Sequence, residues 1–122
     1  AEVPIWDSRA RFGDSDLLVR NMEMGRDLAR TVGAAPTALM RGHGSVVAER
    51  ALRRAVYTAI ALQTSANLQE KTARYRTVTF LSPGEVEHSR RMLDDVEGQP
   101  QQGIDRAWEY FCYRAGVAYT SR

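Results

Sequence analysis

Cysteine, lysine and long apolar runs are scarce in this chain of 122 residues. Cys112 is the single cysteine, so no disulfide forms within the chain and a reducing compartment is expected. No apolar run approaches the ~18 residues that a membrane span needs, and the sequence opens with no leader of the signal-peptide type. We therefore expect a cytoplasmic protein without a membrane-spanning segment.

Several common catalytic and binding motifs are also missing. The sequence has no cysteine pair for a structural zinc site, no His-Glu-x-x-His motif, no phosphate loop and no Gly-x-Gly-x-x-Gly fingerprint. Lys71 is the only lysine, and its polar surroundings argue against an imine-forming nucleophile. The net charge is only +2, and the basic residues between 50 and 76 lie at helical spacing, mixed with Glu49 and Glu70. This pattern is typical of a solvated helix face, so we expect no nucleic-acid partner.

What the sequence does contain is a series of helix and strand signals. The elements expected in the first half are an extended segment over 3–6, a helix over 17–32 that follows capping residues 13–16 and ends at Gly33, and strands over 37–40 and 45–47. Those expected afterwards are a helix over 49–75, a strand over 77–81, a capping-box helix from Ser82 to about Val96, a loop over 98–103 and a helix over 104–114 that Gly116 ends. This alternation favours an α/β fold, and the low strand count predicts a single partial domain over 1–122.

Few side chains qualify as chemical groups. His88 lies in a polar helix stretch and is expected on the surface, while Cys112 is expected to be an inert buried thiol. His43 stands between two glycines after an apolar strand, which lets the backbone turn sharply and another group approach the ring. A metal ligand or proton carrier fits this placement, and so does a structural histidine. The final helix is rich in aromatic residues, so we expect it to be buried on more than one side, within the domain or against a partner.

Residues 38–47, Ala-Leu-Met-Arg-Gly-His-Gly-Ser-Val-Val, followed by a long helix from Glu49, resemble the class II aldolase/adducin family. Residues 3–6 and the helix that ends at Gly33 are similar to the family's approach to this motif. The likeness implies the C-terminal half of a three-layer α/β/α class II aldolase-like domain. Residues 81–85 and 106–110 look most like a branch that decarboxylates hydroxylated aromatic or pyridine carboxylic acids.

The resemblance implies a metal site and a reaction class. Family members hold a divalent ion, zinc or manganese, with three histidines, of which His43 matches one; the other two form a His-x-His pair that this sequence lacks. The ion acts as a Lewis acid when a carbon–carbon bond breaks. The likeness therefore implies a metal-dependent lyase, with decarboxylation favoured and a sugar-phosphate aldolase or epimerase as the alternative. A non-catalytic, adducin-like interaction module is the rival from another class.

Further roles follow from the same resemblance. Arg41 is expected to bind a substrate carboxylate or, alternatively, to pair with a structural acid. Members usually form homotetramers in which C-terminal residues complete a neighbouring site, so the resemblance makes Trp108 a substrate contact, Tyr110 or Tyr113 an acid and Glu109 a base; simple packing is the alternative. The expected partners are a small hydroxy-carboxylate, further copies of the chain, and a second polypeptide or a longer chain that supplies the first half of the domain.

Overall fold

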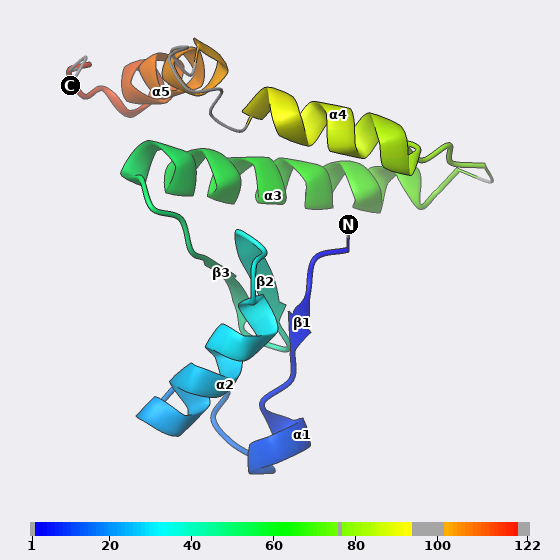
Figure 1. The fold of residues 1–122 in the computed structure, drawn as a ribbon, viewed down its shortest axis with the longest axis vertical. Coiled ribbons are helices and arrows are strands. Elements are labelled where there is room, and N and C mark those ends of the chain that lie inside the picture. The colour runs from blue at the N-terminus through cyan, green and yellow to red at the C-terminus, as the bar shows by residue number, and fades with distance from the viewer. Residues whose placement is uncertain (1, 76, 94–101, 120–122) are drawn as a thin grey trace. The chain divides into compact units, whose positions relative to one another are not determined.

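The computed structural model describes residues 2–75, 77–93 and 102–119. The chain divides into two compact units, which we call the hairpin unit (residues 2–50) and the helical unit (residues 51–119 as described). Figure 1 labels their helices and strands in chain order. The prediction of one partial domain over 1–122 stays a prediction.

The hairpin unit combines a small sheet with two helices. Its elements are β1 (Ile5–Trp6), α1 (Arg9–Phe12), α2 (Met22–Val32), β2 (Thr37–Met40) and β3 (Gly44–Val47). β1 pairs in parallel with β2, with Trp6 opposite Met40, and β2 pairs antiparallel with β3, with Met40 opposite Gly44. The chain between β1 and β2 passes through α2, as a connection between parallel strands usually does.

The core of the hairpin unit lies between α2 and one face of the sheet. Trp6, Met24 and Met40 are its buried residues, and Phe12, Leu28 and Val46 pack against them. Since α2 contacts both β1 and β2, the core ties the helix to the two parallel strands. Apolar packing against this core therefore fixes the end of β2, the strand that precedes the His43 turn.

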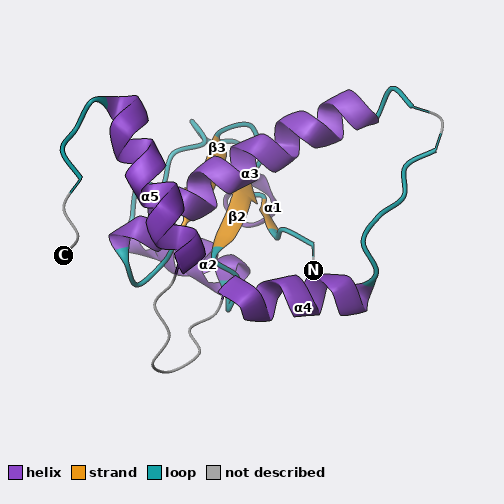
Figure 2. Ribbon diagram, turned by 90° about the horizontal axis from the view of Figure 1, so that it is seen from above, coloured by secondary structure: helices purple, strands orange, loops and turns teal. Residues whose placement is uncertain are grey.

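The helical unit contains α3 (Leu52–Thr72), α4 (Pro83–Leu93) and α5 (Gln102–Ala115), drawn in purple in Figure 2. α3 contacts α5, and Ile104 and Cys112 are the buried apolar residues of α5. A salt bridge of 2.8 Å between Arg53 Nη1 and Asp105 Oδ1 links the two helices. None of the described helices combines the length and apolar character that crossing a bilayer requires.

Most predicted elements are confirmed. The strands around His43, the ends of two helices at Gly33 and Gly116, and the α/β class agree with the sequence analysis. At the start of α4, the Ser82 amide donates to Glu85 Oε2 at 2.7 Å and the Glu85 amide donates to Ser82 Oγ at 3.2 Å, which is the predicted capping box. The three-layer arrangement stays a prediction.

Three predictions differ from the structure. The helix expected over 17–32 begins only at Met22, and the short helix α1 was not expected at all. The long helix is shorter than 49–75 at both ends, since α3 covers Leu52–Thr72. Residues 77–81 form no strand in the described structure, because a strand needs a partner and Phe80 lies 78% exposed.

Two further predictions fall partly outside the described residues. The end of the third expected helix near Val96 and residues 98–101 of the expected loop are not described. The last two residues of that loop, Gln102 and Gly103, are helical, so α5 starts two residues before its predicted beginning.

Candidate functional site

His43 lies in the turn Arg41-Gly42-His43 that joins β2 to β3. Its backbone amide donates to the Met40 carbonyl at 3.0 Å, and its side chain is exposed. Gly42 has φ +73° and Gly44 has φ +149°, conformations that a residue with a Cβ rarely adopts. The two glycines are thus required by the turn, and they leave the imidazole open to another group, as the sequence analysis predicted.

Arg41 is fixed beside this turn by two contacts to the end of β1. Its backbone amide donates to the Trp6 carbonyl at 2.9 Å, and its Nε lies 2.7 Å from Asp7 Oδ1. The hydrogen bond from Arg41 lowers the pKa of the Asp7 carboxyl, which also accepts from the Arg9 amide at 3.0 Å. Asp7 is therefore a structural acid with which Arg41 pairs, which was one of the two alternatives for Arg41 in the sequence analysis. The Arg41 side chain is 46% exposed.

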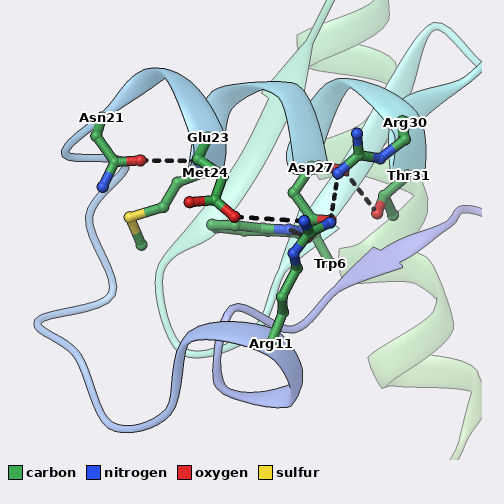
Figure 3. Close-up of polar contacts among 8 residues, drawn as sticks. All are labelled: Trp6, Arg11, Asn21, Glu23, Met24, Asp27, Arg30 and Thr31. Carbon is green, nitrogen blue, oxygen red and sulfur yellow. Dashed lines mark hydrogen bonds and ion pairs between the residues drawn. The ribbon is translucent and has the colours of Figure 1, made fainter.

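A hydrogen-bonded network around Asp27 links β1, α1 and α2 (Figure 3). The buried Trp6 indole donates from Nε1 to Asp27 Oδ2 at 3.0 Å, while Arg11 and Arg30 donate to Oδ1 at 2.9 and 3.0 Å. The hydrogen bond from Trp6, followed by that from Arg30, lowers the pKa of Asp27 to about 2. β1, α1 and α2 are joined through this one carboxylate.

The predicted site residues of α5 belong to the helical unit. Trp108 lies under the Arg53 guanidinium, whose Cζ is 5.9 Å from the ring centroid. Arg114 donates to the Tyr110 hydroxyl oxygen at 3.0 Å, so this phenol is engaged by a cation. Glu109 is exposed and Tyr113 is 80% exposed. Within the described chain, α5 therefore buries one side only, and the catalytic and substrate-binding roles stay predictions.

The predicted metal site requires three ligand side chains that lie close together. No three His, Cys, Asp or Glu side chains among the residues that the structure describes lie close enough together to hold an ion. His43 and His88 are both exposed, and His88 lies on α4 at the surface as the sequence analysis predicted. The described residues thus do not fit a complete three-ligand site, and a site that uses His43 needs ligands from elsewhere.

Sequence reasoning singled out His43 and Arg41 but missed Asp7, which pairs with Arg41, and Asp27, which accepts from the Trp6 indole of the neighbouring strand. Asp7 and Asp27 act through contacts that span many positions, such as Trp6 to Asp27 and Asp7 to Arg41. No local spacing marks such pairs. The one available signal was that Asp7 directly follows an extended segment, just as Arg41 directly follows a predicted strand; in the structure these two segments pair as parallel strands.

Comparison with known proteins bears on the hairpin unit directly. The family model described as "Class II Aldolase and Adducin N-terminal domain" matches residues 1–69, more than half of the chain. The match includes the whole hairpin unit with the His43 turn and most of α3. No curated protein matches the chain significantly.

Proposed function

Because the chain belongs to the class II aldolase and adducin N-terminal domain family, we propose that it is part of a metal-dependent carbon–carbon lyase. Its contribution to the metal site is one ligand, His43. The observation that carries this proposal is the exposed His43 ring between two positive-φ glycines, within the matched segment.

The geometry of the turn supports His43 as a ligand. A metal-binding imidazole must present a ring nitrogen to the ion while its backbone stays fixed. The hairpin supplies the fixed backbone through the hydrogen bond from the His43 amide to Met40, and the exposed ring supplies the access. The remaining ligands lie, in this proposal, on a preceding segment of a longer chain or on a second polypeptide.

Arg41 is proposed to bind a carboxylate of the substrate. The contact that the ion pair with Asp7 makes is at Nε, and the two terminal nitrogens form another edge of the same planar guanidinium. Two parallel N–H groups match the two oxygens of a carboxylate. In this arrangement Asp7 orients Arg41, and Arg41 orients the substrate beside His43.

The proposed reaction is the decarboxylation of a hydroxylated aromatic or heteroaromatic acid. Its support is the likeness of residues 81–85 and 106–110 to decarboxylases, and both segments lie beyond the matched residues 1–69. Cleavage or epimerisation of a sugar phosphate is the alternative within the family. In either case we propose that α5 of one copy completes the site of another in a homotetramer, where Trp108 contacts substrate and Tyr110, Tyr113 or Glu109 moves a proton.

An adducin-like interaction module is the second candidate. It is favoured by the finding that no three potential ligands cluster among the described residues. The two candidates differ in what copurifies: the lyase carries a divalent ion once its other ligands are present, and the interaction module carries none.

The test compares two histidine variants of the complete protein. Intact mass under denaturing conditions first establishes which polypeptides make up the purified material, and metal content is measured on the same sample. His43→Ala is expected to reduce bound metal at least tenfold, while His88→Ala, the matched control on α4, leaves it unchanged. Equal metal content in both variants would show that His43 is no ligand, and a metal-free parent protein would favour the interaction module.

A further inference from the structure

Leu17 has an unusual backbone in the loop before α2. Its φ is +64°, and it is the one non-glycine residue with a positive φ among those that the structure describes. A leucine in this region is strained by contact between its Cβ and its own backbone. Such a conformation persists only where neighbouring groups hold it in place.

Side chains of the same loop hold this conformation. The Leu17 amide donates to Ser15 Oγ at 3.2 Å, and the next amide, that of Leu18, donates to Asp16 Oδ1 at 3.2 Å. Asp16 in turn accepts from Arg20 Nε at 2.8 Å. These hydrogen bonds join loop residues on both sides of the strained Leu17.

The Leu17 side chain reaches the turn that carries His43. A Cβ built on Gly42 would lie 3.1 Å from Leu17 Cδ1, which is closer than nearly all real Cβ contacts. Leu17 therefore packs closely against the backbone of Gly42, where an added Cβ would force the Leu17 side chain to shift by a few tenths of an ångström. Gly42 itself has φ +73°, so two residues with positive φ, one in the loop and one in the turn, meet directly before His43.

We propose that Leu17 is a positioning residue for His43, acting through Gly42. The proposal rests on the proposed function of His43 as a metal ligand. The Leu17 side chain of the strained loop packs against the turn at Gly42. The hydrogen bond from the His43 amide to the Met40 carbonyl fixes the turn at His43. Removing the Leu17 side chain releases the turn and lets the His43 ring sample several orientations.

The first test measures the motion of the turn in the full chain. Leu17→Ala is expected to lower the NMR order parameter of the His43 amide from about 0.85 to below about 0.6 and to broaden the ring signals. Leu17→Met restores an apolar chain that reaches Gly42 and is expected to rescue both. Val19→Ala is the matched control, because Val19 in the same loop faces Gly25 of α2, with Cγ1 3.8 Å from a Cβ built there. Unchanged His43 signals in folded Leu17→Ala protein would overturn the proposal.

A second variant separates side-chain contact from backbone strain. Leu17→Gly removes both, whereas Leu17→Ala removes only the contact, so a loosened turn in both assigns the effect to the side chain. A turn that loosens in Leu17→Ala but stays ordered in Leu17→Gly would overturn this assignment.

Metal affinity of the complete protein connects the motion to function. Leu17→Ala is expected to weaken metal binding roughly tenfold, as loss of an outer supporting contact does, and Leu17→Met to restore it. An unchanged affinity with a loosened turn overturns the positioning role. If His43→Ala also leaves the metal in place, the proposed function fails, and the NMR comparison still decides whether Leu17 orders the turn.

Discussion

The core of the hairpin unit allows a quantitative prediction of the stability that Met24 contributes. This side chain is 5% exposed and lies with Trp6 and Met40 in the core that joins α2 to the sheet. Met22, two residues earlier on the same helix, is 70% exposed. The pair allows one chemical change, methionine to alanine, to be made in a buried and in an exposed position of α2.

The expected cost follows from the atoms removed. Met24→Ala deletes three heavy atoms, and at ~0.8 kcal/mol per buried methylene-sized group the lost transfer energy is about 2.4 kcal/mol. The cavity left behind adds to this, so we expect a loss of about 3 kcal/mol in the free energy of unfolding, within the roughly 2–5 kcal/mol of buried methionine-to-alanine changes. Met22→Ala is expected to change it by less than about 0.5 kcal/mol.

Urea unfolding followed by tryptophan fluorescence measures this difference. The chain has two tryptophans, one in each unit, so the variants are made in a Trp108→Phe background in which Trp6 alone reports on the hairpin unit. Equal losses in both variants would refute the assignment of Met24 to the core. No loss in either would refute the packing of α2 on β1 and β2.

Two further predictions concern the same helix. Asn21→Ala removes the side-chain oxygen that accepts from the Met24 amide at 2.9 Å and is expected to cost about 1 kcal/mol in unfolding free energy, measured by the same urea assay. The pKa of Asp27 is lowered from 3.8 to about 2, so its charge stabilises the folded state above about pH 4 and this contribution is lost as the pH falls toward 2. The urea midpoint of the hairpin unit should therefore drop across this range, and Asp27→Asn, which can still accept from Trp6, should flatten the drop; an unchanged slope would contradict the Asp27 network.

Signals that act within a few residues were readable from the sequence. The capping box at Ser82 and the glycines that end α2 and α5 depend on neighbouring backbone groups alone. The hairpin around His43 was readable for the same reason, since a short strand, a glycine-flanked turn and a second strand follow each other directly.

The start of α2 shows why a local signal can mislead. Ser15 and Asp16 were expected to cap a helix, because their oxygens accept backbone hydrogen bonds. In the structure they do accept such bonds, but from the amides two residues on. This pattern stabilises a turn and does not start a helix. Asn21 provides the actual cap, and the positive φ of Leu17 keeps that residue out of a helix.

The missing strand over 77–81 has a different cause. β-branched and aromatic residues favour a strand only where a partner strand satisfies the backbone and a core covers one face. In the described structure this segment has neither, and both Phe80 and Leu81 are exposed. Composition could not reveal this, because the partner is a property of the fold.

The candidate site lies where the topology itself concentrates chemical groups. β1 and β2 are parallel, so their carboxyl ends meet at one edge of the sheet, which is where α/β folds commonly bind ligands. Asp7 follows β1 and Arg41 follows β2, and their ion pair brings the two strand ends together beside His43. Asp7, Arg41 and His43 thus lie on the segments that follow the carboxyl ends of β1 and β2. That they bind a ligand there stays a prediction, and the positive-φ glycines on either side of His43 are what a tight turn between two strands requires in any case.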